Sequence, residues 1–446
     1  MKKILSIITI SLFAGSVSAQ TAYTLDELKK LATDSSAEML TARNNIEAAR
    51  HQKKEAFTNY FPQISATAFA FKSSDDMMKM DINTSDVLSP ELAAGLSTVL
   101  PPQMLQSIPE NISVGALDGG AIASISAIQP VFAGGQIVNG NRLADIGVTA
   151  SELQLQLSKN QTEMSVEQYY WQLVSLKEKL KTIDAVSGLL QRLESDVAAA
   201  EKAGVAIKND LLQVKIKINE INKARIQIEN GLDLTRRLLA NKVGKSADGF
   251  DVAEPTDSLP DFSMSIDHNQ AVENTTEYRL LDANVNVNEL QKKMSVGKNL
   301  PTVAVGAGYT AMRLMETNNN FGMIFATANV PISGWWGGSH ATKRQEIALD
   351  NARTQRDNTR ELLIINMDNC LNAVNDARRQ LDIAAETVSQ SEENLRLNQD
   401  YYRVGTSTMS DLLQAEQQHR QALDALTDAK IEYQMALMKY RQAVGN

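Results

Sequence analysis

Proline is absent from two long stretches of this sequence, residues 131–254 and everything after Pro331. Because proline interrupts the interior of a helix, these are the places where long helices can run without a break. Gly135 and Gly204 bound a span of nearly seventy residues in the first stretch, which would be on the order of 100 Å long if mostly helical. Apolar residues recur there at three- and four-residue steps, as in a coiled coil: Leu173, Leu176, Leu180, Ile183, Leu190 and Val197. The sequence therefore predicts long helical rods rather than a compact globular domain.

The chain also repeats itself. The tetrapeptide Asp-Leu-Leu-Gln and a glycine that precedes it recur at one offset of 201 residues: 210–213 and 411–414, Gly204 and Gly405. Pro62 and Pro301 match at a larger offset of 239 residues, which places about 38 additional residues in the first copy. We interpret the chain as a tandem duplication.

The duplication predicts the domain organisation. Residues 20–244 form the first repeat and residues 266–446 the second, joined by an irregular connector at 245–265. Each repeat is expected to run from a helix through a proline-flanked segment into a long helix pair, which turns at Gly204 or Gly405.

The proline-flanked segments, residues 62–132 and 301–332, are expected to be strand hairpins. They hold four runs rich in Ala, Val, Ile, Thr, Phe and Gly, each close to the roughly 9–11 residues that a tilted membrane strand requires. The runs are Ile64 to Lys72, Ile122 to Phe132, Thr302 to Met312 and Phe321 to Ile332. The additional residues of the first copy are expected to form a long polar extracellular loop at 73–118. Ordinary soluble hairpins remain an alternative, because alternation over so few residues is a weak signal.

Aromatic residues gather near the predicted junctions between strand and helix: Tyr60, Phe61, Phe132, Trp335 and Trp336. Such placement is typical of the aromatic girdle of a membrane barrel. An open four-stranded sheet in lipid would leave edge groups unpaired, so a chain with these strands must oligomerise if it spans. Two copies give eight strands, whose interior is filled by side chains, whereas three copies give twelve and leave room for a passage.

The first residues indicate export from the cytoplasm. Lys2 and Lys3 precede an apolar run, and Val17-Ser18-Ala19 supplies the small residues that a signal peptidase reads. We therefore expect residues 1–19 to be a cleaved signal peptide, since the run is shorter than the ~20 residues of a spanning helix. Cleavage would leave 42 basic and 53 acidic residues, a net charge of −11.

The composition argues against catalysis and against nucleic-acid binding. The net charge of −9 provides no basic face for phosphates. One cysteine and four scattered histidines offer no metal-ligand spacing, so we expect no cofactor and no metal site. Residues 306–311 loosely match a dinucleotide-binding loop but lack the helix that must follow it. Residues 244–246 resemble the end of a phosphate-binding loop but lack the glycine that must precede them. The nearby methionines Met77, Met78 and Met80 are interpreted as a chance cluster in a flexible loop rather than a soft-metal site.

With these features the chain resembles the TolC-like outer-membrane efflux proteins. The resemblance is carried by the signal peptide, the internal repeat, and two motifs: Gln129-Pro130-Val131-Phe132-Ala133-Gly134-Gly135, and Tyr402-Arg403-Val404-Gly405-Thr406 ahead of the second Asp-Leu-Leu. It covers residues 23–445. In the second copy the first motif departs from the pattern, with Gly337 and Gly338 two residues late.

The resemblance implies a mainly α fold with a small β part. Long coiled-coil helices would form a periplasmic α-barrel, and four transmembrane β-strands per protomer would close a 12-stranded barrel as a trimer. The strand–helix junctions would be marked by Pro62, Pro130, Gly134, Gly135, Pro301 and Pro331.

The resemblance also implies roles for residues near the glycine turns. In the family these turns lie at the periplasmic tip and dock the adaptor; here they comprise Ala203, Gly204, Val205, Arg403, Val404, Gly405 and Thr406. The periplasmic aperture would be formed by Tyr402, Asp411, Gln414, Asp210 and Gln213. Ser407 and Gln414 stand where the family pattern has a basic and a second acidic residue. For Asp411, a charge at a helix N-terminus favoured by the macrodipole is an equal alternative to a gating role.

The resulting interpretation is a passive trimeric channel without enzymatic activity. It would conduct substrates from the periplasm to the exterior in a tripartite efflux or type I secretion system. Its partners would be two further copies of itself, a periplasmic adaptor, an inner-membrane transporter and outer-membrane lipid. The alternative is a periplasmic coiled-coil adaptor or scaffold, which would carry a compact β-domain instead of membrane strands.

Overall fold

The computed structural model describes residues 21–96, 98–101, 107, 109–255, 262, 266–314 and 317–445. The predicted signal peptide, and residues 256–261 and 263–265 of the expected connector, lie outside that part. Among the described residues, no helix combines the length and the apolar character needed to cross a membrane.

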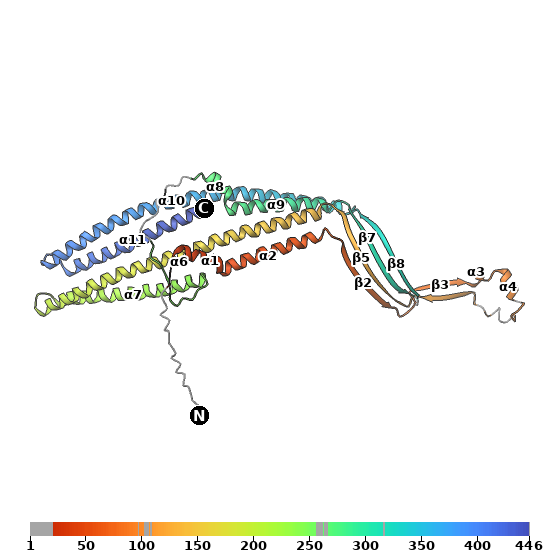
Figure 1. The fold of residues 1–446 in the computed structure, drawn as a ribbon, viewed down its shortest axis with the longest axis horizontal. Helices are drawn as coiled ribbons and strands as arrows, with labels where there is room; N and C mark the ends of the chain where they lie inside the picture. Colours follow the sequence, from red (N-terminus) through yellow and green to blue (C-terminus); the bar gives the residue numbers. More distant parts are fainter. Residues whose placement is uncertain are drawn as a thin grey trace, which may run out of the picture. The chain divides into compact units, whose positions relative to one another are not determined.

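The first repeat runs from short helices through a strand region into a long helix pair (Figure 1). Its elements are β1 (Thr21–Tyr23), α1 (Leu25–Ser35), α2 (Ala37–Thr58), β2 (Gln63–Lys72), β3 (Met78–Asn83), α3 (Thr84–Val87), α4 (Pro90–Leu96), β4 (Asn111–Ala116), β5 (Gly119–Ala133), α6 (Gln136–Lys202) and α7 (Lys208–Lys242). In the expected connector, β6 (Phe250–Val252) pairs in parallel with β1.

The second repeat follows the same plan with fewer elements. They are α8 (His268–Asn274), α9 (Thr276–Gly297), β7 (Thr302–Leu314), β8 (Thr317–Asn329), α10 (Gly334–Arg403) and α11 (Met409–Ala443). The helices α6 and α10 are 67 and 70 residues long. They are the rods predicted from the proline-free stretches, since no residue in them forces a break.

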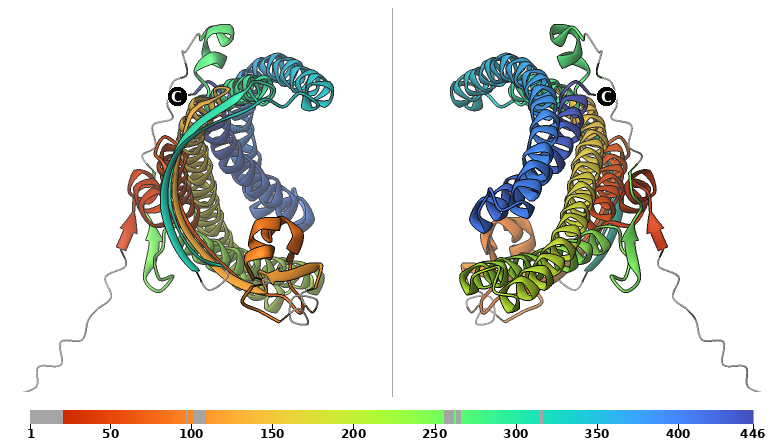
Figure 2. Two further views of the ribbon diagram at one scale, coloured as in Figure 1. Left: turned by 90° about the vertical axis from the view of Figure 1, so that its right-hand side faces the viewer. Right: turned by 90° about the vertical axis from the view of Figure 1, so that its left-hand side faces the viewer.

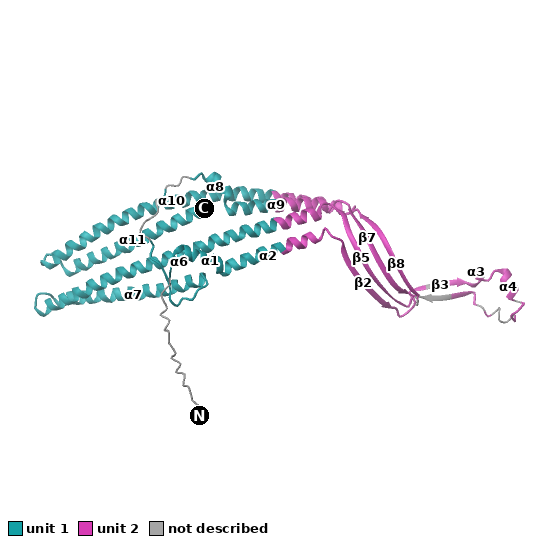
Figure 3. Ribbon diagram, viewed as in Figure 1, with its two compact units in different colours: residues 1–50, 146–286, 350–446 teal, residues 51–145, 287–349 magenta. Residues whose placement is uncertain are grey.

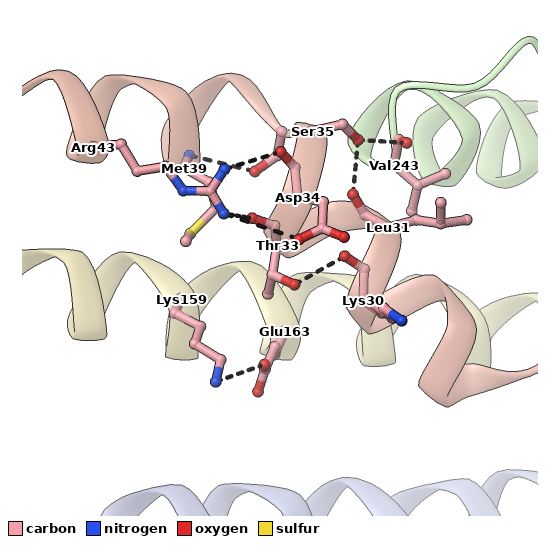
Figure 4. A network of polar contacts seen from close by, with 11 residues as sticks. Lys30, Leu31, Thr33, Asp34, Ser35, Met39, Arg43, Lys159, Glu163 and Val243 are labelled. Carbon is pink, nitrogen blue, oxygen red and sulfur yellow. Dashed lines mark hydrogen bonds and ion pairs between the residues drawn. The ribbon is translucent and has the colours of Figure 1, made fainter.

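Polar contacts fix the break between α1 and α2 (Figure 4). Ser35, at the end of α1, donates its hydroxyl to the carbonyl oxygen of Val243 at 3.0 Å and so joins this helix end to the end of α7. The Arg43 guanidinium donates back to the carbonyl oxygens of Asp34 and Thr33, at 3.2 and 2.8 Å. These carbonyls lie at a helix C-terminus and lack intrahelical partners, so the guanidinium satisfies them.

Four strands form one antiparallel sheet in the order β2-β5-β7-β8. They are 10, 15, 13 and 13 residues long and lie where the strand hairpins were predicted. The hairpins come from different repeats and are joined by the pairing of β5 with β7. The strands curve together along their length (Figure 2). β2 and β8 are the two edges of the sheet.

The segment predicted as a polar loop, residues 73–118, contains more regular structure than expected. β3 and β4 form an antiparallel hairpin whose register runs from Met78 opposite Ala116 to Asn83 opposite Asn111. The short helices α3 and α4 follow β3. Two of the three clustered methionines therefore belong to a strand rather than to a flexible loop.

Internal contacts divide the chain into two compact units that do not coincide with the repeats (Figure 3). The helical unit comprises the described parts of residues 1–50, 146–286 and 350–446. The strand unit comprises those of residues 51–145 and 287–349. Each unit takes segments from both repeats, because α2, α6, α9 and α10 run from one unit into the other.

Three apolar clusters form the core of the helical unit. The first joins α8, α10 and α11 around Tyr433 and Tyr440. The second joins α1, α6, α7 and β6 around Leu28. The third lies between α6, α7 and the start of α11 around Val214. The predicted seam of α6 is confirmed, since it is buried in these clusters at Leu173, Ile183, Leu190 and Val197.

Candidate functional site

Two glycine turns end α6 and α10, at the positions that the repeat predicts. Gly204 and Gly405 have φ angles of +75° and +80°. The residues after them, Val205 and Thr406, each donate a backbone N–H to the carbonyl five residues earlier, at 2.9 Å. This is a glycine-terminated helix C-cap, in which a left-handed residue follows the last helical turn. Glycine takes that conformation without a Cβ penalty.

No close packing requires glycine at these two turns. A Cβ built on Gly204 or Gly405 would meet no heavy atom within 4 Å. The backbone conformation is therefore the whole reason for glycine at these turns.

The surface around the two turns is exposed and partly apolar. Val205 is 83% exposed and Val404 is 71% exposed. Arg403 extends from the end of α10 and pairs with Asp400, with 3.2 Å between nitrogen and oxygen. Ala203 and Thr406 are also exposed. The tip residues that the sequence analysis assigns to adaptor docking are thus exposed on the single chain.

Two of the predicted aperture residues come together in the helical unit. Tyr402, near the end of α10, is half-buried against the third apolar cluster. Burial, together with the negative charge of Asp210 at the start of α7, raises the pKa of the Tyr402 phenol. The phenol thus stays neutral and can donate a hydrogen bond. Gln213 on α7 is half-buried, and Gln414 on α11 is exposed.

Asp411 is held by its own helix end. Its carboxylate accepts hydrogen bonds from the backbone N–H and the hydroxyl of Thr408, at 3.0 and 2.6 Å. The Thr408 hydroxyl accepts one from the Asp411 N–H at 3.2 Å, which completes a capping box. The bonds from Thr408, and a weaker one from Ser407, hold the pKa of Asp411 below its usual range. Asp210, in the first turn of α7, is not part of a capping box, because the N-cap residue there is Ile207, whose side chain makes no capping hydrogen bond.

A groove beside Tyr402 escaped the sequence analysis. It encloses about 370 Å³ between α6, α10 and α11, and leucines form much of its wall. Glu416 also lines it, although this residue is only 3% exposed and both its carboxylate oxygens are buried without a hydrogen-bond partner. Burial raises the pKa of this carboxyl. One feature of the sequence could have drawn attention to Glu416: the equivalent position of the first repeat is Lys215, so the two repeats carry opposite charges there.

The predicted junction prolines lie at or near strand ends in the strand unit. Pro62 and Pro301 directly precede β2 and β7, and Pro331 follows β8 by two residues. Pro130 lies inside β5, beyond its last pair with β2 and at a register shift in its pairing with β7. A residue without an N–H is tolerated there because a bulge leaves the ladder interrupted.

Gly134 and Gly297 touch backbone to backbone where β5 turns into α6. Gly134 has a φ of +58° and is buried. A Cβ at this position would overlap the carbonyl oxygen of Gly297. Gly135 has a φ of +75°, and its Cβ would meet only the side-chain nitrogen of Asn139, at 3.3 Å. In the second repeat Gly334 begins α10, and Gly338 makes room for the side chain of Asn299.

The predicted junction aromatics are all substantially exposed on the single chain: Tyr60, Phe61, Phe132, Trp335 and Trp336. Tyr60 and Phe61 pack edge-to-face on Phe57, with ring centroids 5.6 and 5.5 Å apart. Trp335 donates its indole N–H to the carbonyl of Asn299 at 2.8 Å. Contacts within the chain thus hold the rings of Tyr60, Phe61 and Trp335, and all five rings leave apolar area exposed.

Comparisons with known proteins agree with this architecture. The sequence model of the family described as outer membrane efflux protein matches residues 269–446. A search of the curated proteins finds no match.

Several solved outer-membrane proteins have a similar fold. The outer membrane protein VceC of Vibrio cholerae is 15% identical, with a TM-score of 0.73 over 95% of this chain and 96% of its own. The CmeC outer membrane channel of Campylobacter jejuni is 14% identical, with a TM-score of 0.77 over 94% and 85%. The MtrE outer membrane channel of Neisseria gonorrhoeae, solved in an open state, is 14% identical, with a TM-score of 0.70 over 96% and 92%.

The second part of the chain therefore matches the sequence pattern of this family, and nearly the whole chain has the fold of outer-membrane channels.

Proposed function

We propose that three copies of this chain form a passive duct of a tripartite efflux or type I secretion system, which conducts substrates from the periplasm to the exterior. One observation carries the proposal: the four-stranded sheet ends in two edge strands, β2 and β8. Unpaired backbone groups are costly in lipid, and closing the sheet with further copies satisfies them. Three copies give twelve strands, enough for a passage along the axis.

The side chains of the edge strands support a membrane setting. Ile64 and Phe69 on β2 are 72% and 59% exposed, and Ile324 and Met323 on β8 are 89% and 51% exposed. Apolar side chains left so open on a single chain favour burial in lipid or against another copy. The alternative role, a periplasmic coiled-coil scaffold, provides no reason for these strands.

The chain is proposed to act without enzymatic chemistry. The family consists of channels, and the energy for transport would come from an inner-membrane transporter. The helical unit would lie in the periplasm. Its exposed tips around Gly204 and Gly405, with Val205, Val404 and Arg403, would dock the periplasmic adaptor.

The aperture is proposed to lie beside these tips. Tyr402 and Asp210 lie close to each other there, and Asp411, Gln414 and Gln213 lie within the first two turns of the neighbouring helices. If the carboxylates face a three-fold axis, they form an acidic ring that favours cations.

Disulfide cross-linking of the edge strands tests the proposal. In a Cys370→Ser background, Met323→Cys in β8 is combined in turn with single cysteines along residues 64–70 of β2. We expect at least one pair to link chains covalently into trimers in the outer membrane. Ser124→Cys with Thr310→Cys is the control, because these residues are opposite each other within one chain and should give no intermolecular product. Absence of any interchain link along β2 would overturn the proposal.

A further inference from the structure

The groove between α6, α10 and α11 combines an apolar wall with a buried acid. Its volume of about 370 Å³ falls in the range of small-molecule sites. Leu189 and Leu193 on α6 face Leu412 and Leu413 on α11 across it, and Tyr402 lines it from α10. All these residues belong to the helical unit.

Glu416 is the most buried charged residue of this lining. It is 3% exposed, and neither carboxylate oxygen has a hydrogen-bond partner. A buried carboxylate normally has such partners, because leaving it unpaired costs several times more than leaving a neutral group unpaired. The chain itself thus leaves the hydrogen-bonding capacity of this acid, which lines the groove, unused.

The nearest cations have other partners. Lys217 on α7 donates to Gln417 at 2.7 Å and pairs with Glu220 at 3.1 Å. Arg420, one turn further along α11, pairs with Asp424 at 3.0 Å. Their charges and that of Glu220 modulate the pKa of Glu416, but burial is the larger effect and raises it.

The remaining charges of the groove lie at its exposed rim. They are Arg192 and Asp196 on α6 and Arg403 on α10. Charges in such exposed positions are screened by water and contribute little to recognition. Glu416 is therefore the acid that can distinguish a cationic ligand from a neutral one.

We propose that this groove binds a small amphiphilic organic cation, with the apolar body against the leucines and a protonated amine hydrogen-bonded to the Glu416 carboxylate. An ammonium group provides the N–H donors that the carboxylate lacks, and charge-assisted bonds of this kind are stronger than neutral ones. The proposal does not rest on the transport function, since all the lining residues come from one chain.

Three matched probes test the proposal on the purified full-length mature protein in lipid nanodiscs. They are 1-naphthylmethylammonium, the neutral 1-naphthylmethanol and the anionic 1-naphthylacetate. Isothermal titration calorimetry measures the affinity of the protein for each of them. We expect the cation to bind at least tenfold more tightly than the alcohol, and the anion to bind most weakly. Equal affinity for cation and alcohol, or no binding of the cation, would overturn the proposal; the latter is also the result expected if a second copy covers the groove.

Two substitutions locate the charge recognition. Glu416→Gln should weaken binding of the cation about tenfold or more and leave binding of the alcohol unchanged. Asp196→Asn is the control, because this acid lies at the exposed rim, and it should change affinity for the cation less than threefold. An equal loss in both variants would overturn the assignment to Glu416.

A pH series and a blocking variant provide independent readouts. Affinity for the cation should fall as the solution is acidified and Glu416 takes up a proton, and this dependence should be absent in Glu416→Gln. Leu189→Trp fills the groove and should abolish binding of both cation and alcohol while the helical content by circular dichroism is unchanged. Unchanged binding in Leu189→Trp would place the probes elsewhere and overturn the proposal.

Discussion

Replacing Gly134 by alanine tests the backbone contact that closes the turn from β5 into α6. The new Cβ would lie 2.8 Å from the carbonyl carbon of Gly297 and 3.0 Å from its Cα, so backbone on at least one side must shift. Overpacking of this kind costs about 1–3 kcal/mol. The φ of +58° adds about 1–2 kcal/mol for a residue with a Cβ. Gly134→Ala should therefore destabilise the junction by about 2–5 kcal/mol.

Gly135→Ala is the matched control for this prediction. Its φ is +75°, but its Cβ would meet only the end of the Asn139 side chain, which can move away. The expected loss is about 1–2 kcal/mol, from the backbone conformation alone. Hydrogen exchange of peptides covering residues 130–140, in the lipid-reconstituted protein, measures the free energy of local opening in both variants. Equal losses would refute the reasoning, because the contact with Gly297 would then contribute nothing.

Other substitutions test the tips and the start of α11. Gly405→Ala and Gly204→Ala should each cost about 1–2 kcal/mol from positive φ alone, since neither new Cβ would meet an atom within 4 Å; hydrogen exchange at the two tips checks this, and unchanged protection would contradict it. Asp411→Ala should remove the capping box with Thr408 and speed exchange in the first turn of α11; in single-channel recordings, unchanged closure and cation selectivity would remove Asp411 from the aperture. The pKa of the Asp411 carboxyl in the folded protein is lowered from 3.8, so its stabilisation of this turn is fully present above pH 3.8 and is lost as the pH falls through the folded pKa. If this turn stays protected from exchange in stronger acid, the assignment is contradicted. The folded pKa of Glu416 is raised from 4.5, so stability should fall as the pH rises from 4.5 towards the folded value; Glu416→Gln should raise the thermal midpoint at pH 7, and an unchanged midpoint would count against a buried, unpaired acid.

The long helices and the strands were predictable because the positions of proline limit where helices and strands can run. Proline at 62, 301 and 331 stands at or near strand ends, and its absence over 131–254 allows α6 and α7 to run. The β3–β4 hairpin was missed although both strands alternate apolar and polar residues, because each strand is only 6 residues long and a long segment separates the two in the sequence. The division into two units was missed because it follows contacts between the repeats, and those depend on tertiary packing.

The candidate site was predictable only where the backbone itself leaves a mark in the sequence. The turns at Gly204 and Gly405 need a left-handed residue, and the repeat shows the same glycine twice. The proximity of Tyr402 to Asp210, by contrast, depends on how α10 meets α7, and these elements are far apart in the chain. The burial of Glu416 has the same origin, because the groove around it is built from three helices. An acid on a helix is usually solvated, so composition alone predicts the opposite environment.

Native mass spectrometry of the protein extracted from outer membranes tests most directly the claim that further copies complete the open sheet. The account predicts a complex of three mature chains that persists in detergent and disassembles when the β2 and β8 edges are blocked by proline. A single chain that stays monomeric and soluble without detergent would contradict it.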